Sequence, residues 1–180
     1  EARIGHWTPE QGLSPITSWR AHKNEAEIAG FRRAMQHDGV ALVRFHRELD
    51  EKVADDSINQ ETEWSIAERL EEIRAEHPEY RGLSFATIAG YAGNGAIVHY
   101  EATAEDHAQL ADKSFLLLDS GAHYVSGTTD ITRTIPLGVL SDEEKKAYTL
   151  VLKGMIQLSM AHFPAGTTGL ALDFAARQSM

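Results

Sequence analysis

The chain has 180 residues, enough for one domain with a hydrophobic core, because a chain of this length buries roughly 70% of the surface that it exposes when unfolded. It carries 17 Lys and Arg against 27 Asp and Glu, a formal net charge of −10. We expect no nucleic-acid partner, since binding to phosphates needs concentrated positive charge. The absence of cysteine excludes thiol nucleophiles, disulfides and thiolate metal sites, so any metal must have oxygen or imidazole ligands.

The two ends of the chain indicate its context. No run approaches the roughly 20 apolar residues that span a bilayer, and the start lacks the features of a signal peptide, so we expect a soluble, cytoplasmic protein with no membrane partner. Residues 1–22 contain Trp, Pro and Gly without a clear period and are interpreted as a linker or the edge of a preceding domain. The chain starts without methionine and stops at Met180 inside a predicted helix. Residues 23–180 are therefore expected to be the N-terminal part of a truncated domain.

Two helices are predicted in the first half of the chain. Asn24 and Glu27 have the spacing of a capping box, and apolar residues follow at helical intervals. The inward-facing residues of this helix are Ile28, Phe31, Met35, Leu42, Phe45 and Leu49. Residues 50–59 are a polar connection whose first residues are compatible with a longer helix. A second helix is predicted from about residue 62 to residue 77, ending at Pro78, and its inward-facing residues are Trp64, Ala67, Leu70 and Ile73.

Strands and two further helices are predicted in the second half. Residues 83–103 and 114–138 are rich in β-branched, aromatic and glycine residues, which is typical of short strands joined by turns. Ser141 with Glu144, and a threonine at 167 or 168, mark the starts of two helices. The first helix has an apolar stripe of Tyr148, Leu152, Met155 and Leu158, and the inward-facing residues of the second are Leu172 and Ala175. This order lacks a βαβ alternation and favours a mixed α/β chain of the α+β kind, an antiparallel sheet with helices packed on one side.

Two aspartates flank a predicted β-hairpin. Asp119 ends the apolar run 115–118, and Asp130 lies at the start of the next strand. The pair Ser126–Gly127 suits a turn better than Tyr124–Val125 does. We therefore expect an off-centre turn with a glycine bulge, which would bring both carboxylates onto one face.

Three interpretations of these aspartates remain open. Each residue can simply flank a turn, or one can form a structural ion pair with Arg133. An ionised carboxylate at the end of a buried strand is costly unless it is paired or metal-bound, and carboxylates on adjacent strands are suitable ligands for hard divalent cations. A dinuclear metal site is the third interpretation.

Histidines are the other candidate residues. His99 ends a predicted strand; a lone histidine in an apolar run is more often a hydrogen-bonded core residue, but imidazole also suits acid, base and ligand roles. His123 is expected to be solvated. His37, His46 and His162 lack the i, i+4 partner of a zinc-binding helix and are interpreted as structural. No phosphate loop, dinucleotide motif or serine nucleophile elbow is present.

Three motifs resemble a known family. They are NGAIVHY at 94–100, LLLDSGAHYVSGTTDITRTIPLG at 116–138 and HFPAGTTGLALDFAAR at 162–177. Together they are similar to the catalytic domain of the Xaa-Pro aminopeptidase (aminopeptidase P) family, pita-bread metallopeptidases of family M24, over roughly residues 22–180. The resemblance implies a partial pita-bread fold and a hydrolase that removes the N-terminal residue from peptides with proline in second position.

The resemblance also implies a dinuclear metal site. Two divalent cations are expected, Mn²⁺ with Co²⁺ or Zn²⁺ as substitutes; Asp119 would bind one of them and Asp130 would bridge both. His99 would line the active site and contact the substrate near the scissile bond. The metals would activate a water for attack on the carbonyl group before proline and stabilise the charge that develops. A homodimer is expected at the level of the family.

The sequence departs from the family pattern in its missing ligands. The family also uses a histidine and two glutamates further along the chain, and His107, His123 and His162 are not in a matching context. Two carboxylates alone cannot neutralise and enclose two divalent ions. We therefore expect the 180-residue chain to bind metal weakly or not at all, to cleave no peptide, and to expose an apolar face that promotes self-association.

Two other functions are compatible with a pita-bread domain. A pita-bread domain can be a catalytically inactive module that binds peptides or proteins, but the retained aspartates argue against this. A metal-free hydrolase of the creatinase type uses a histidine for proton transfer and predicts that the aspartates are replaced, whereas Asp119 and Asp130 are present.

Overall fold

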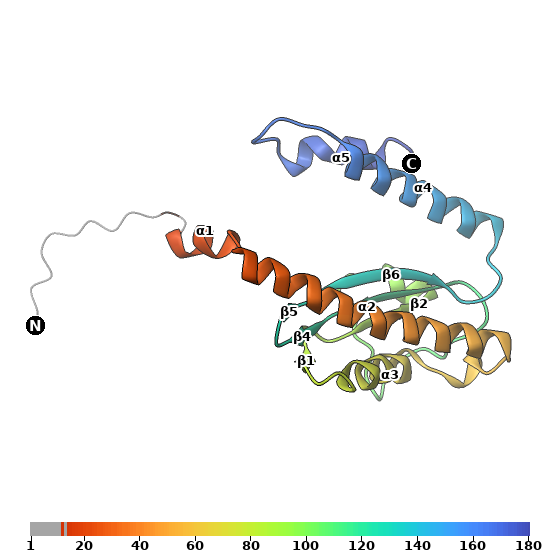
Figure 1. Cartoon of the computed structure of the whole chain (residues 1–180). Helices are drawn as coiled ribbons and strands as arrows, with labels where there is room; N and C mark the ends of the chain where they lie inside the picture. Colours follow the sequence, from red (N-terminus) through yellow and green to blue (C-terminus); the bar gives the residue numbers. More distant parts are fainter. Residues whose placement is uncertain (1–11, 13) are drawn as a thin grey trace, which may run out of the picture.

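The computed structural model describes residue 12 and residues 14–180. In this part of the chain a layer of two helices lies against a twisted sheet, and two more helices extend beyond the other side of the sheet (Figure 1). The predicted linker at 1–22 falls largely outside the described residues. Its described part contains α1 (Pro15–Ala21), a short helix without buried residues, and the interpretation as a linker stays a prediction.

The helical layer consists of α2 (Glu25–Ala54) and α3 (Glu63–Ala75). The predicted capping box at the start of α2 is confirmed, because Asn24 and Glu27 each accept a 2.9 Å hydrogen bond from the other's backbone amide. Helix α2 continues into the predicted polar connection as far as Ala54, and a short 3-10 helix, η1 (Ile58–Gln60), follows. Thr62 caps α3 in the same reciprocal way, with Ser65 as its partner.

Two three-stranded antiparallel sheets share one long hairpin. The first sheet has the order β2-β3-β6, with β2 (Ile88–Tyr91), β3 (Phe115–Ser120) and β6 (Ile131–Pro136); the second has the order β1-β4-β5, with β1 (Tyr80–Leu83), β4 (Ala122–Tyr124) and β5 (Gly127–Thr128). Strand β3 runs into β4 through Gly121, and β5 runs into β6 through residues 129–130. The antiparallel pairing agrees with the prediction, while the division into two sheets was not predicted.

The hydrophobic core lies between the sheet and the helical layer. Side chains alternate along β3, so that Leu116, Leu118 and Ser120 are buried while Phe115, Leu117 and Asp119 are half-buried. The buried leucines belong to a cluster with residues of both helices, including Phe45, Leu49, Leu70 and Ile73, and each such side chain contributes about 1.5–3 kcal/mol by its burial. Helices α2 and α3 therefore cover one face of the sheet. Asp119 lies on the opposite face, which these two helices leave uncovered; we call it the open face.

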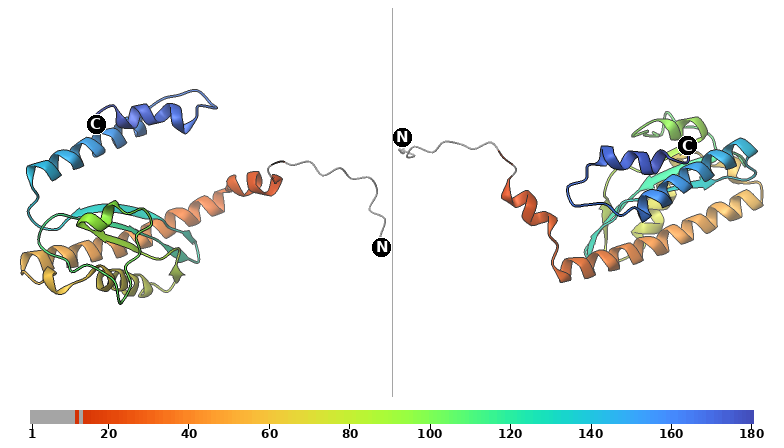
Figure 2. Two further views of the ribbon diagram at one scale, coloured as in Figure 1. Left: turned by 180° about the vertical axis from the view of Figure 1, so that it is seen from behind. Right: turned by 90° about the horizontal axis from the view of Figure 1, so that it is seen from above.

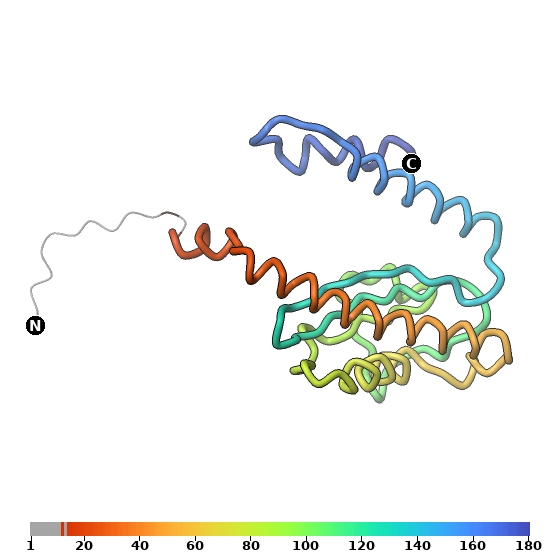
Figure 3. Tube along the Cα trace, in the orientation of Figure 1, coloured from red at the N-terminus to blue at the C-terminus, as the bar shows by residue number. Residues whose placement is uncertain are grey.

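Helices α4 (Asp142–Met160) and α5 (Gly169–Arg177) form a helical hairpin next to this open face. The chain leaves β6, enters α4 through a short loop and folds back through α5 along α4 (Figures 2 and 3). The predicted caps at Ser141 and Thr168 are confirmed. The apolar stripe of α4 is only partly covered, because α4 packs mainly on α5 and leaves Leu152 38% and Met155 53% exposed.

The first half of α2 departs from the predicted burial. Ile28, Phe31 and Met35 are 40%, 38% and 45% exposed, whereas Ala34 and Asp38 are buried. The reason is a close approach between backbones: the tip of the hairpin packs against α2, where Gly30 and Ala34 leave room for it. Within residue 12 and residues 14–180, no helix combines the length and the apolar character needed to cross a membrane.

Candidate metal centre

The hairpin from β3 to β6 is regular in its register. Ser120 pairs with Ile131, and three residues further on His123 pairs with Thr128. Both strands therefore advance by the same number of residues, and the hairpin closes on a two-residue turn at 125–126. The turn is off-centre between the two aspartates, as predicted, but it lies one residue before Ser126–Gly127 and the predicted glycine bulge is absent. The residue preferences were misleading because packing of the tip against α2 outweighs them.

Both aspartates nevertheless lie on one face. Asp119 pairs with Thr132, and Asp130 precedes Thr132 by two residues, so the alternation of side chains places Asp130 on the same side. A turn displaced by one residue shifts the register by two, which leaves every side chain on its original face. The face that they share is the open one, opposite α2 and α3.

Asp119 carries an unsatisfied oxygen. Its Oδ1 atom is buried and has no hydrogen-bond partner among the described residues, a condition that costs about 1–3 kcal/mol or more for a charged group. Arg133, the partner in the ion-pair interpretation, instead donates a 2.7 Å hydrogen bond from Nη1 to the carbonyl oxygen of Thr132. A divalent cation between the strands would supply the missing partner, because carboxylate oxygens are the ligands of hard cations. The two aspartates therefore fit a metal site.

His99 is not on a strand. Its segment forms a 3-10 helix, η2 (Ala92–Ala96), followed by a turn in which His99 is exposed and has a φ of 56°. The predicted strand is wrong because the glycines fold back onto the sheet: a Cβ atom at Gly90 would lie 2.8 Å from the Cα atom of Gly95. A positive φ costs a non-glycine residue about 1–2 kcal/mol, so the surrounding contacts must hold this conformation.

The buried carboxylate of Glu63 provides such contacts. Glu63, at the start of α3, is 0% exposed and accepts hydrogen bonds from the Tyr91 amide at 2.6 Å, the Ala108 amide at 2.7 Å, the Asn94 side chain at 3.0 Å and the Tyr100 hydroxyl at 2.7 Å. Asn94 and Tyr100 bracket the turn with His99. Burial and the neighbouring Glu63 raise the pKa of Tyr100 to about 12.

The described residues bring part of a metal centre together. Helix η2 packs on β2 and β3, so the segment that carries His99 lies on the same sheet as Asp119. Within residue 12 and residues 14–180, no three His, Asp or Glu side chains converge closely enough to bind one cation. The structure thus places Asp119 and Asp130 on one face and His99 on an adjoining turn, which provides two candidate ligands and no enclosed site.

Three charged residues are buried although the sequence did not predict it. Asp38, Glu63 and Arg74 are each 0% exposed. Asp38 lies on the buried stripe of α2, between Ala34 and Leu42 at intervals of four residues, and a carboxylate on such a stripe is a signal of a buried partner. The partners themselves come from distant parts of the chain, so the pattern of one helix does not identify them.

The sequence matches Metallopeptidase family M24 over residues 29–180, and the chain therefore belongs to this family. Its helices and antiparallel strands are those of the pita-bread fold of M24 enzymes.

Relatives in this family are Xaa-Pro aminopeptidases. A protein of Metarhizium robertsii named "Probable Xaa-Pro aminopeptidase P" is 46% identical over 176 residues, which make up 98% of this chain and 28% of that protein. The X-prolyl aminopeptidase of Caenorhabditis elegans, a cytosolic enzyme with a di-nuclear active site, has a TM-score of 0.84 at 36% identity, covering 92% of this chain and 27% of that one. The X-Pro aminopeptidase of Thermotoga maritima has a TM-score of 0.73 at 29% identity, covering 92% and 43%. This chain spans little more than a quarter of the length of the curated relatives.

Proposed function

We propose that this chain forms part of the catalytic domain of a metal-dependent aminopeptidase that removes the N-terminal residue from peptides with proline in second position. The observation that carries the proposal is the placement of Asp119 and Asp130 on one open face of a hairpin, with a carboxylate oxygen of Asp119 buried and unpartnered. Membership of family M24 and the names of the relatives support the same reaction.

In this proposal Asp119 and Asp130 would hold two divalent cations, Asp119 as a ligand of one and Asp130 as a ligand shared by both. The cations are Mn²⁺, with Co²⁺ or Zn²⁺ as substitutes, and when bound they supply Lewis-acid chemistry, that is polarisation of a carbonyl group and activation of water. His99 contacts the substrate near the scissile bond from its turn beside β2. The carboxylates of Asp119 and Asp130 would serve as the oxygen ligands that hard divalent cations prefer.

The wider assignments are part of the same proposal. Residues 23–180 are the N-terminal part of the catalytic domain, and residues 1–22 are a linker or the edge of a preceding domain. The substrates are peptides that start with Xaa-Pro; we expect no nucleic-acid or membrane partner, a cytoplasmic location and a homodimer. Because the described residues offer two carboxylates and no third ligand nearby, the 180-residue chain by itself is expected to bind metal weakly or not at all and to leave peptides uncleaved.

Metal binding tests the two ligands. We expect Mn²⁺ titrated into the 180-residue protein to broaden the NMR signals of residues 117–120 and 129–132 weakly and selectively, because a bound paramagnetic ion relaxes nearby nuclei. Asp119→Asn and Asp130→Asn should each remove this broadening. Asp142→Asn, on a fully exposed side chain at the start of α4, should leave it unchanged. Selective broadening that survives in both site variants would exclude these aspartates as ligands.

Activity is tested in a full-length protein that contains these residues. With Mn²⁺ it should release the first residue of an Xaa-Pro peptide and lose this activity on chelation of the metal. Asp130→Asn should lower kcat by about 100-fold or more, because metal ions supply several kcal/mol of transition-state stabilisation. Cleavage that resists both chelation and Asp130→Asn would contradict the proposal. Peptide binding without cleavage would instead favour the inactive binding module.

A further inference from the structure

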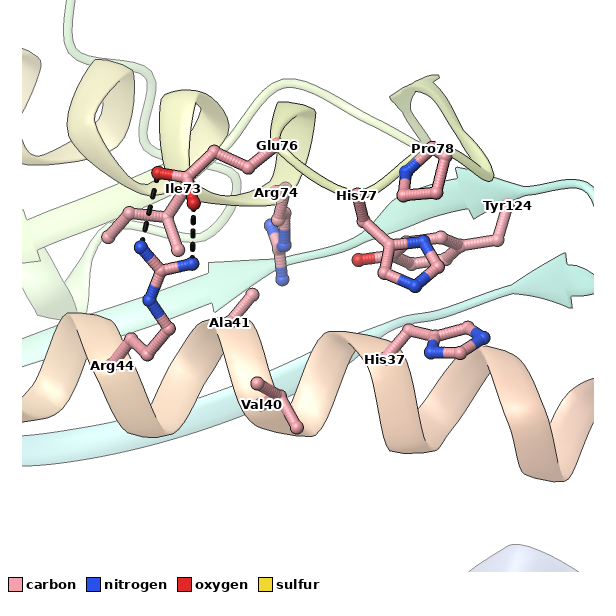
Figure 4. A pocket seen from close by; sticks show the side chains of 10 residues that line it. All are labelled: His37, Val40, Ala41, Arg44, Ile73, Arg74, Glu76, His77, Pro78 and Tyr124. Carbon is pink, nitrogen blue, oxygen red and sulfur yellow. Dashed lines mark hydrogen bonds and ion pairs between the residues drawn. The ribbon is translucent and has the colours of Figure 1, made fainter.

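A buried ion pair lies behind the hairpin, on the face opposite to the two aspartates. Asp38 of α2 and Arg74 of α3 are both 0% exposed, and Arg74 donates from Nε and Nη2 to the two oxygens of Asp38 at 2.6 and 3.1 Å. Figure 4 shows Arg74 between the two helices, beside Tyr124 of the hairpin. Desolvation costs several kcal/mol for each buried ion. Such a pair therefore adds little net stability to the folded protein, and we expect it to have another role.

The same ion pair binds the neighbour of each aspartate. Ser120, which follows Asp119, accepts a 3.1 Å hydrogen bond from Arg74 Nη2. Thr129, which precedes Asp130, donates a 2.7 Å hydrogen bond from Oγ1 to Oδ2 of Asp38. Because successive side chains point to opposite faces of a strand, the ion pair binds the back of the hairpin at the two positions whose neighbours carry the carboxylates.

Side-chain and backbone hydrogen bonds combine where these contacts occur. The amide of Ala122 donates to Thr129 Oγ1 at 3.0 Å, and the carbonyl oxygen of Thr129 accepts from the hydroxyl of Ser84 at 2.9 Å. One backbone bond remains, from the amide of Thr129 to the carbonyl oxygen of Ala122 at 2.9 Å, and the ladder between β3 and β6 ends at Ser120 and Ile131. The position of Asp130 therefore depends on side-chain hydrogen bonds of Thr129 as well as on this backbone bond.

We propose that Asp38 and Arg74 are positioning residues that set the separation and orientation of Asp119 and Asp130, and thereby the affinity of the hairpin for divalent cations. Arg74 holds the β3 side through Ser120, and Asp38 holds the β6 side through Thr129. The inference rests on the proposed metal-binding role of the two aspartates. It adds residues from two helices to a site whose ligands come from the hairpin.

The test removes the hydroxyl group of Thr129 and keeps the ion pair. Thr129→Val preserves the shape of the side chain, so the hairpin keeps its core packing but loses both its bond to Asp38 and the acceptor of the Ala122 amide. We expect the affinity for Mn²⁺, measured by calorimetric titration of a full-length protein that contains these residues, to fall about 10-fold, the usual scale for groups that orient metal ligands. Thr129→Ser restores the hydroxyl group and should restore the affinity.

A matched control separates positioning from stability. Tyr124→Phe deletes another buried hydroxyl that donates to the same carboxylate, at 3.2 Å from Asp38 Oδ1, but Tyr124 is not next to either aspartate. Both variants lose one hydrogen bond to Asp38, and Thr129→Val also leaves the amide of Ala122 without its acceptor, so the larger loss of stability is expected for Thr129→Val, measured by urea unfolding. Only Thr129→Val should weaken Mn²⁺ binding. A loss of affinity that follows stability equally in both variants would overturn the inference, and so would an unchanged affinity in Thr129→Val.

A measurement without metal distinguishes this inference from the proposed function. In the metal-free protein Thr129→Val should shift the backbone amide signal of Asp119, which is ten residues away in the sequence, whereas Tyr124→Phe and Thr129→Ser should not. If Mn²⁺ binding proves independent of Asp119, the metal site fails while this shift still reports whether the contacts of Thr129 position the carboxylate of Asp119. An Asp119 amide signal that stays unchanged in Thr129→Val would show that they do not.

Discussion

The hydroxyl group of Tyr100 donates a 2.7 Å hydrogen bond to Glu63, a fully buried carboxylate at the start of α3. Glu63 also accepts from the side chain of Asn94, so both ends of the turn with His99 are attached to one residue of the helical layer. At this first position of a helix the carboxylate is also stabilised by the helix dipole. Glu63 therefore links the helical layer to the segment that lies on the open face.

Removal of this carboxylate should release the segment. Glu63→Ala leaves the buried amide of Tyr91, and the half-buried amide of Ala108 and hydroxyl of Tyr100, without their acceptor, so we expect a loss of about 3 kcal/mol in the free energy of unfolding. Hydrogen exchange of residues 92–100 should accelerate more than exchange in β3, because the loss is local. Urea unfolding and exchange measured by NMR or mass spectrometry provide both values.

Glu68→Ala is the matched control for this prediction. Glu68 lies on the same helix and is exposed, and exposed substitutions of this kind usually change stability by about 0.5 kcal/mol or less. Equal effects of the two substitutions, or uniform acceleration of exchange throughout the sheet, would contradict a specific role of Glu63 in holding the turn.

The same contact makes the stability of the folded protein depend on pH in the alkaline range. Burial, followed by the hydrogen bond to Glu63, raises the pKa of Tyr100 from its ordinary value of 10.0 to about 12 in the folded protein. The folded state therefore retains a proton that the unfolded state loses above about pH 10. The stabilising contribution is complete below pH 10 and disappears as the pH rises to about 12. Unfolding in urea at several pH values should show a smaller alkaline loss of stability in Tyr100→Phe than in the wild-type protein; identical slopes would exclude this origin.

Sequence patterns predicted the starts of those helices whose capping residues bind each other within a few residues. The capping boxes at Asn24 and Ser141 act within four residues, and both helices start where their spacing indicates. The shared face of Asp119 and Asp130 was also predictable, because moving the turn by one residue shifts the register by two residues and leaves side chains on the same face. The turn residues were misjudged because Ser126 and Gly127 pack against α2, an element that lies far away in the sequence.

The buried polar contacts could not be read from local patterns. Arg74 meets Asp38 across 36 residues, and Thr129 meets Asp38 across 91. The periodicity of α2 marks position 38 as inward-facing, but only the packing of α3 and the hairpin on that position makes a carboxylate acceptable there. Likewise the position of His99 depends on Glu63, which is 36 residues earlier. Sequence motifs were thus sufficient to identify the candidate ligands. The residues that position these ligands could be identified only from the three-dimensional structure.

Gly121 should be intolerant of any side chain. It lies between β3 and β4 beside the two aspartates, and a Cβ atom there would overlap with the carbonyl oxygen of Thr129 and the hydroxyl of Ser84. Because the first of these is backbone, the hairpin itself must move. We expect Gly121→Ala to lower the free energy of unfolding by about 1–3 kcal/mol, measured in urea, and to shift the amide signal of Asp130.

Gly39→Ala is the opposite case and serves as a control. Gly39 lies inside α2, and a Cβ atom there would meet nothing within 4 Å. Alanine in a helix interior is more favourable than glycine by about 0.5–1 kcal/mol, so this substitution should stabilise the protein. If both substitutions destabilise the protein by similar amounts, steric overlap at Gly121 is not the cause.

The apolar surface of α5 should drive self-association. Leu170 and Phe174, one helical turn apart on the same side, are 87% and 72% exposed, and contiguous exposed apolar side chains of this kind promote association between molecules. Sedimentation velocity over a series of concentrations should reveal oligomers of the 180-residue protein, and Leu170→Glu or Phe174→Glu should reduce them. Val43→Glu adds the same charge at a residue of α2 that is 71% exposed and should have little effect. A similar reduction by all three substitutions would indicate that added negative charge, rather than loss of the α5 surface, keeps the molecules apart.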